Sequence, residues 1–235
     1  MNEAFQNLSF TLVEGNRTKD VVLPVRRMII AGWTGRHADA MEAHIKELEK
    51  LGVTRPERTP MFYRVAASLL TNAEAIEVSG SASSGEVEFF VTRIDGDFWV
   101  GVASDHTDRK AEVYGVALSK QMCGKPVGKK LWRLNDVKDH WDQLQLRSYA
   151  INNKDKRLYQ EGTVAAMLPI EQLLEMFRSE DDQGGIGSGD FMMCGTLPAI
   201  GGVRGADTFL VEMIDPVLDR RMAHEYGIKV LPVAG

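Results

Sequence analysis

The sequence has little cysteine, no long apolar run and no block of basic residues. Its two cysteines, Cys123 and Cys194, are isolated in a chain of 235 residues, so neither a disulfide framework nor a metal-binding cysteine motif is indicated. No apolar stretch reaches the length of a membrane span, and the N-terminus MNEAFQNLSF does not resemble a signal peptide. These absences predict a cytoplasmic protein without a membrane partner.

A nucleic-acid partner is also not expected. The net charge is −5, and basic residues do not cluster. The glycine-rich segment from Gly195 to Gly202 lacks the lysine and the spacing of a nucleotide-binding P-loop. What remains is an ordinary soluble composition, 44% hydrophobic and 26% charged, which is enough for a sizeable core.

Strand-like segments dominate the chain and are linked by hairpin signals. Alternating or apolar runs that are typical of strands lie at 8–13, 28–32, 61–65, 146–151 and 208–214. Helical spacing marks 36–51, 110–121 and 169–178. Because a repeating βαβ pattern is absent, we predict a mixed α/β, predominantly β fold with a few peripheral helices. It would form one domain over 1–235, with a small strand and helix extension at 1–60.

One hairpin organises the predicted fold. Glu86 and Glu88 are two residues apart in an apolar strand, so their side chains point to the same face. Asp95-Gly96 is a strong signal for a two-residue hairpin turn. With that turn, the register places Asp105 directly opposite Glu86, at a Cβ separation of roughly 4.5–5.5 Å. Three carboxylates are therefore predicted to converge on one patch of sheet.

Opposed carboxylates destabilise a sheet unless a cation lies between them. Because all three donors are oxygens, a hard cation is favoured over zinc: Mg²⁺, or alternatively Mn²⁺ or Ca²⁺. The competing interpretation is a solvated face whose acidic residues only keep the protein soluble.

The predicted helix at 36–51 carries a second candidate group. His44 and Glu47 are three residues apart and share a face, so they form either a surface pair or a general-base dyad that acts on water. His37 with Glu42 is a rival pair in the same segment.

Several segments, in one order over about residues 28–215, resemble motifs of the fumarylacetoacetate hydrolase-like superfamily. The matching segments are Glu86-Val87-Glu88, Asp105 to Arg109, Lys120 to Pro126, Asn153 to Thr163 with Gln160, and Gly189-Asp190 followed by Gly195 to Pro198. The chain departs from the family pattern at Asp108, Lys154 and Leu197, and Gly32-Trp33-Thr34 stands where the family has Asn-Tyr. It therefore resembles a divergent bacterial branch of the superfamily.

The resemblance implies a β-roll with a divalent metal, usually Mg²⁺, a 2-oxo acid as substrate, and often a homodimer. On this interpretation the metal ligands are Glu86, Glu88 and Asp105. Lys120 would neutralise an oxyanion, with Lys125 as its competitor. His44, oriented by Glu47, would activate water, and the substrate-binding residues would be Gln160, Thr196 and Arg64.

The first hypothesis for the reaction is hydrolysis of a C–C bond in an acylpyruvate or related diketo acid. Without water activation, the same site would act as a decarboxylase or a tautomerase. A hypothesis of another class is a protein that binds 2-oxo acids without turning them over. All three share the metal and the class of ligand.

Overall fold

The computed structural model describes residues 3–50 and 52–234, except for the side chains at positions 44, 47 and 48. Within these residues the larger sheet has eight strands, in the spatial order β2 (Arg17–Val25), β1 (Gln6–Glu14), β12 (Lys130–Arg133), β9 (Asp97–Ser104), β8 (Val87–Ile94), β15 (Asp190–Thr196), β3 (Arg27–Gly32) and β4 (Met61–Val65).

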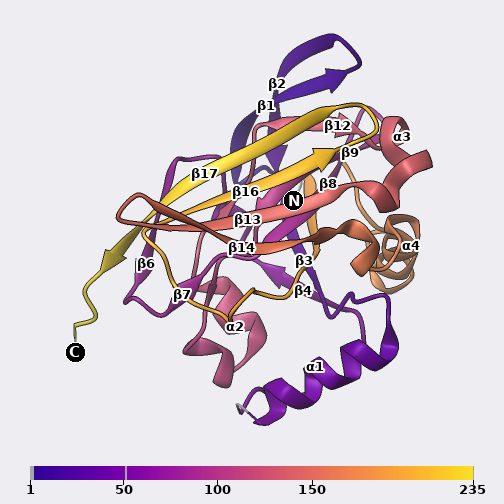
Figure 1. Cartoon of the computed structure of the whole chain (residues 1–235). Coiled ribbons are helices and arrows are strands. Elements are labelled where there is room, and N and C mark those ends of the chain that lie inside the picture. Colours follow the sequence, from indigo (N-terminus) through magenta and orange to yellow (C-terminus); the bar gives the residue numbers. More distant parts are fainter. Residues whose placement is uncertain (1–2, 51, 235) are drawn as a thin grey trace.

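A smaller sheet lies in front of the larger one in the view of Figure 1. Its five strands, again among the described residues, are β14 (Asp155–Thr163), β13 (Gln145–Asn152), β16 (Thr208–Asp215), β17 (Arg220–Leu231) and β6 (Ala75–Ser79). Two short strand pairs are β10 (Thr107–Asp108) with β7 (Ser83–Ser84), and β11 (Lys125–Pro126) with β5 (Leu70–Thr71).

The helices lie at the edges of the two sheets (Figure 1). They are α1 (Ala38–Lys50), α2 (Val116–Gln121), α3 (Leu134–Val137) and α4 (Ile170–Glu180), with short 3₁₀ segments at Ala67–Leu69, Ala111–Val113, Lys138–Gln143 and Val164–Ala166. None of the helices in the described part of the chain is long and apolar enough to cross a membrane. The predicted mixed, predominantly β fold with a few peripheral helices is confirmed.

The larger sheet curls around one hydrophobic core. The rings of Phe10 on β1 and Phe191 on β15 stack with centroids 5.7 Å apart, although three strands separate β1 from β15 in the sheet. At about 4.8 Å per strand, a flat sheet would hold them roughly 19 Å apart. The sheet must therefore roll so that these two strands face each other across its interior.

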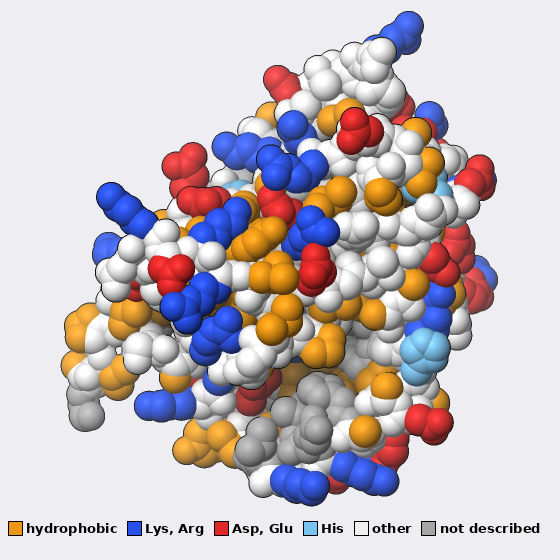
Figure 2. Space-filling model, in the orientation of Figure 1, with side chains coloured by type: hydrophobic (Ala, Val, Ile, Leu, Met, Phe, Trp, Pro, Cys, Tyr) orange, Lys and Arg blue, Asp and Glu red, His pale blue; other side chains and the backbone are white. Residues whose placement is uncertain are grey.

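A second core lies between the two sheets. Phe89 of β8 and Val102 of β9 point into it from the larger sheet, and Leu146 of β13 and Val211 of β16 do so from the smaller one. On the opposite, outward face of the smaller sheet, hydrophobic side chains lie between basic and acidic ones (Figure 2). This division into one buried and one solvated face is usual for antiparallel sheets.

Two local predictions were wrong. No strand was predicted beyond residue 214, yet β17 runs over Arg220–Leu231 and pairs with both β16 and β6. His224 on that strand is only 9% exposed. The helix expected over 110–121 is interrupted at Gly115, whose φ of +154° ends one short turn and lets α2 begin.

Candidate metal centre

The hairpin of β8 and β9 has the predicted register. Val87 pairs with Ser104 and Ile94 with Asp97. The turn residues Asp95 and Gly96 have φ values of +50° and +91°, as a two-residue hairpin with positive φ at both positions requires. One step beyond the strand ends, the backbone N–H of Asp105 donates to the carbonyl of Glu86 at 3.0 Å. The two acidic residues are therefore direct neighbours.

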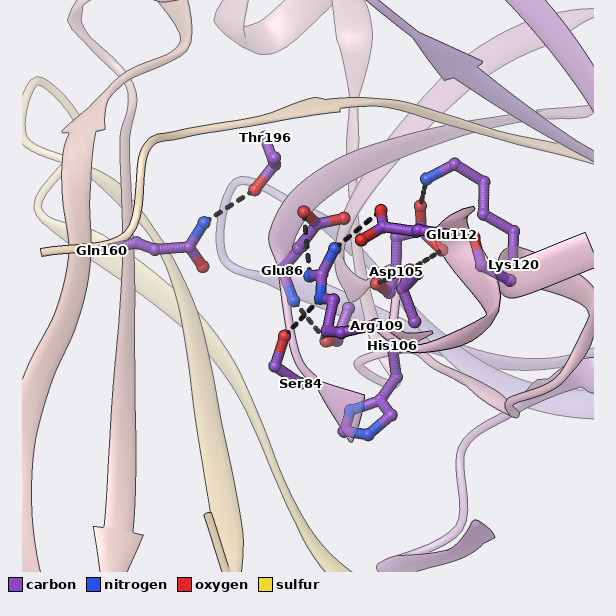
Figure 3. Close-up of polar contacts among 12 residues, drawn as sticks. Ser84, Glu86, Asp105, His106, Arg109, Glu112, Lys120, Gln160 and Thr196 are labelled. Carbon is purple, nitrogen blue, oxygen red and sulfur yellow. Dashed lines mark hydrogen bonds and ion pairs between the residues drawn. The ribbon is translucent and has the colours of Figure 1, made fainter. Parts of the chain in front are cut away.

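The three predicted carboxylates meet inside the fold. One carboxylate oxygen of each of Glu86, Glu88 and Asp105 lies within 4.8 Å of the others. Glu88 is 2% exposed and Asp105 is fully buried, so they are not a solvated acidic face. Figure 3 shows Asp105 and Glu86 with Arg109, Glu112 and Lys120 gathered around them.

Two lysines contact Asp105. Lys120 donates to Oδ2, and the Nζ of Lys125 lies 2.9 Å from Oδ1. Burial alone would raise the pKa of Asp105, but the charges of Lys120 and Lys125 outweigh it and hold that pKa well below its usual range. The sequence left open which lysine belongs to the site, and the structure brings both to it.

This environment shifts the pKa values of the two lysines in opposite directions. Burial lowers the pKa of Lys120, but attraction by Asp105, Glu86 and Glu88 raises it above the ordinary value. Burial and repulsion by Lys120 lower the pKa of Lys125, although Asp105 attracts it. Lys120 is therefore attracted by both glutamates as well as by Asp105, whereas Asp105 is the main attraction on Lys125.

Among the residues that the structure describes, Glu88 forms no ion pair, although the charge of Lys120 attracts it. Its Oε2 accepts the backbone N–H of Gly195 at 2.8 Å. Burial, followed by the negative charge of Asp105, raises the pKa of Glu88 well above its ordinary value. In this environment the ionised form of Glu88 needs a further positive charge.

An oxygen-liganded divalent cation fits these residues. Arg109 bridges Glu86 and Glu112, with Nη2 and Nη1 each 3.0 Å from the respective carboxylate oxygen. Four clustered carboxylates thus face three cations: Glu86, Glu88, Asp105 and Glu112 against Arg109, Lys120 and Lys125. Mg²⁺ or Mn²⁺ prefers such carboxylate donors. The residues that would hold it are Glu86, Glu88 and Asp105.

Gln160 and Thr196, predicted to bind substrate, lie beside the acidic residues and contact each other (Figure 3). Gln160 is 1% exposed. Its Oε1 accepts from the N–H of Val87 and the hydroxyl of Ser148, both at 2.8 Å. Its Nε2 donates to Thr196 Oγ1 at 2.9 Å and to the carbonyl of Leu197 at 2.5 Å. Direct contact with a substrate would cost Gln160 one of these bonds.

Other predicted residues are not brought to the centre. Arg64 is exposed on the edge strand β4 and points to the face opposite Tyr63, whose ring centroid is 6.0 Å from Lys120 Nζ. In the rival dyad, Glu42 forms a bidentate pair with Arg55 rather than with His37. The side chains of His44 and Glu47 lie outside the described residues.

Sequence reasoning missed a buried polar network next to Asp105. His106 is fully buried; its Nδ1 lies 3.1 Å from the hydroxyl of Tyr226, and its Nε2 lies 2.9 Å from Ser83 Oγ. Burial and the charges of Lys125 and Arg109 lower the pKa of His106 to about 3, so the imidazole is neutral. Tyr226 belongs to β17, and the network could not be found without that strand.

Comparison with known proteins gives a family and a fold. The family model described as "Protein of unknown function (DUF2848)" matches residues 31–226. No match was found among curated protein sequences.

Solved structures share the fold at low identity. Cg1458 is 14% identical, with a TM-score of 0.63 over 93% of this chain and 83% of that one. Yeast ynq8, a fumarylacetoacetate hydrolase family protein, is 17% identical, with a TM-score of 0.60 over 89% and 95%. A 2-keto-3-deoxy-D-arabinonate dehydratase complexed with magnesium and 2,5-dioxopentanoate is 16% identical, with a TM-score of 0.61 over 91% and 77%. These likenesses confirm the fold that the motifs predicted.

Proposed function

Since the chain belongs to the DUF2848 family and has a fumarylacetoacetate hydrolase-like fold, we propose that it is a divalent-metal-dependent enzyme that acts on 2-oxo acids. The observation that carries the proposal is the meeting of Glu86, Glu88 and Asp105 within 4.8 Å inside the fold. The magnesium in the similarly folded dehydratase supports a metal of the same kind here.

The charge of the site supports an anionic substrate. The ion-paired cluster carries one more carboxylate than cations. With a divalent ion bound, the net charge of the cluster would change from one negative to one positive charge. A site with a net positive charge attracts the carboxylate of a 2-oxo acid. When bound, the ion would supply Lewis acidity toward the 2-oxo group.

Lys120 is the residue we assign to developing negative charge on the substrate. Its amine contacts Asp105, and the residue is not completely enclosed, at 7% exposure. A cation held in a buried site stabilises an oxyanion far better than one in water. Lys125 is fully buried and also contacts Asp105, which suits a supporting role.

Within this class we propose hydrolysis of a C–C bond in an acylpyruvate or related diketo acid. In that reaction His44, oriented by Glu47, would deprotonate the attacking water. Decarboxylation or tautomerisation of a 2-oxo dicarboxylic acid is the alternative, because both reactions need the same stabilised enolate but no activated water. His44→Ala should separate them: C–C cleavage would be lost, while proton exchange at C3 of the substrate would persist.

The test is a screen of acylpyruvates and oxaloacetate, followed by loss of enol absorbance, with chelator-treated protein and added Mg²⁺ or Mn²⁺. We expect metal-dependent turnover that Glu86→Gln abolishes and that the surface variant Glu77→Gln keeps. Full activity of Glu86→Gln in the presence of chelator would remove the metal from the mechanism. Tight binding of metal and oxaloacetate without turnover of any substrate would indicate a binding protein.

A further inference from the structure

The backbone of Val87, between the two glutamates of the candidate metal centre, is held by side chains at both its N–H and its carbonyl. Its N–H donates to Gln160 Oε1 at 2.8 Å, and its carbonyl accepts the hydroxyl of Thr196 at 2.8 Å. In a regular antiparallel ladder, backbone groups of the adjacent strand would make both bonds. Here that adjacent strand is β15.

A bulge in β15 explains why side chains, and not backbone groups of β15, form the hydrogen bonds with Val87. The pairing shifts by one residue between Met193, which faces Phe90, and Thr196, which faces Glu88. Gly195, at the bulge, has a φ of +105°, and its N–H leaves the ladder to donate to Glu88 Oε2. The bulge therefore re-aims a backbone donor at a metal-ligand carboxylate, as bulges near functional sites often do.

The carboxamide of Gln160 fills the gap that the bulge opens. It accepts from Val87 N–H with Oε1 and donates to the carbonyl of Leu197 with Nε2 at 2.5 Å. Gln160 thus lies between β8 and the end of β15 and joins both to β14, where it pairs with Ser148 of β13. Its buried amide has no free hydrogen-bonding position among these contacts.

We infer that Gln160 is a positioning residue of the metal site: by fixing the Val87 N–H, together with Thr196 at the Val87 carbonyl, it holds Glu86 and Glu88 at the spacing that one ion requires. This inference rests on the proposed metal-dependent function and assigns Gln160 a role other than substrate contact. Residues that orient metal ligands in this way typically change metal affinity about 10- to 100-fold when replaced.

The experiment uses the full chain and needs no substrate. Mn²⁺ binding is measured by calorimetry for wild type, Gln160→Met and Thr196→Val. Exchange of the Val87 amide proton is followed by NMR in the same proteins without metal. Gln6→Met is the matched control: Gln6 Nε2 also donates two bonds to backbone carbonyls, but to those of Ala67 and Leu70 and not to the segment that carries the glutamates.

We expect Gln160→Met to weaken Mn²⁺ binding about 10- to 100-fold and to accelerate exchange at Val87. Thr196→Val, which keeps the side-chain size, should weaken binding in the same direction and provides the measurement if Gln160→Met does not fold. Gln6→Met should leave both readouts within about twofold of wild type.

Two results overturn the inference. One is equal Mn²⁺ binding by wild type and Gln160→Met; if that variant also loses affinity for oxalate, a mimic of a 2-oxo acid enolate, Gln160 contacts substrate instead. The other is unchanged exchange at Val87. If wild type itself binds no Mn²⁺, the proposed function fails together with the inference, whereas equal binding by wild type and variant removes the inference alone.

Discussion

Lys120 and Lys125 contact opposite oxygens of the same carboxylate, that of Asp105. Their surroundings differ: Glu86 and Glu88 also attract Lys120, whereas Lys125 donates its second bond to the carbonyl of His106 at 2.5 Å. We therefore propose that Lys120 serves the reaction and that Lys125 supports the site. Substitution should separate the two roles.

Lys120→Met is expected to lower kcat by about 10²- to 10³-fold, the usual loss for a group that stabilises an oxyanion. Mn²⁺ affinity should be kept or increased, because a cation next to the ligands has been removed. Lys125→Met should instead lower the free energy of unfolding by about 1–3 kcal/mol, since Asp105 and the buried carbonyl of His106 each lose a donor while Asp105 keeps Lys120. Steady-state kinetics, Mn²⁺ calorimetry and urea denaturation measure the three quantities. A kcat loss confined to Lys125→Met would reverse the assignment.

Gly195→Ala should damage both the fold and the metal site. A Cβ at this position would lie 1.9 Å from Thr34 Oγ1, and the φ of +105° already disfavours alanine. Strain and overpacking together predict a loss of about 2–5 kcal/mol in the free energy of unfolding. Mn²⁺ affinity should fall as well, because the N–H that holds Glu88 is displaced.

Gly202→Ala is the matched control for that substitution. Gly202 also has a positive φ, +85°, but a Cβ there meets nothing within 4 Å. Gly202→Ala should lower the free energy of unfolding by about 1 kcal/mol through strain alone and leave Mn²⁺ affinity unchanged. Equal effects of the two substitutions would show that the clash with Thr34 is relieved without cost.

Glu88→Gln is expected to stabilise the metal-free protein while abolishing its stabilisation by metal. Burial and Asp105 raise the pKa of Glu88, so the ionised side chain opposes folding when no cation is bound. An acid whose pKa is raised by folding costs stability as the pH rises above its unfolded value, about 4.5. The advantage of the variant in EDTA should therefore grow as the pH rises from about 4.5 toward the raised folded-state pKa of Glu88.

Thermal unfolding of wild type and Glu88→Gln, each with EDTA and with Mn²⁺, measures the stability of the metal-free protein and its stabilisation by metal. Glu112→Gln is the control, because Glu112 pairs with Arg109 but is not one of the three converging carboxylates. It should still be stabilised by Mn²⁺. If Glu88→Gln is stabilised by Mn²⁺ to the same extent as wild type, Glu88 is not a ligand.

The geometry of the candidate site was predictable where it depended on local sequence. A two-residue turn at Asp95-Gly96 fixes the register of its hairpin, so the meeting of Glu86 and Asp105 followed from counting residues. The same holds for Glu88, because strand side chains alternate between faces. No knowledge of the rest of the fold was needed for this step.

The contacts around the hairpin were not predictable in the same way. The partners of Gln160 come from β8, β13 and β15, and the bulge that makes them necessary is set by packing between distant segments. Alternation shows that Arg64 and Tyr63 point to opposite faces of β4, but it does not show which of these faces points to the site. The exposure of Arg64 could therefore not be predicted. β17 was missed because its inward residues Met222, His224 and Tyr226 include a polar imidazole, which hides the apolar alternation.

Asp215 predicts an acid-dependent loss of stability far from the metal centre. The residue is fully buried at the end of β16. Its carboxylate accepts the N–H groups of Val217 and Leu218, His140 Nε2 at 2.9 Å and Arg220 Nε at 3.0 Å. Burial alone would raise the pKa of Asp215, but these donors outweigh it and lower the pKa below the ordinary value of 3.8.

Because folding lowers this pKa, the ionised carboxylate stabilises the protein above about pH 3.8, and the contribution is lost as the pH falls through the folded value. Asp215→Asn should therefore cost about 1–3 kcal/mol at pH 7, and the difference from wild type should shrink between pH 5 and pH 3. Urea denaturation at pH 7, 5 and 3 measures this difference in stability.

The exposed pair of Asp155 with Arg157 provides the control, since Asp155→Asn should change stability by less than about 1 kcal/mol at any of these pH values. A difference for Asp215→Asn that is equally large at pH 3 would mean that the shape of the side chain, and not its charge, holds the turn.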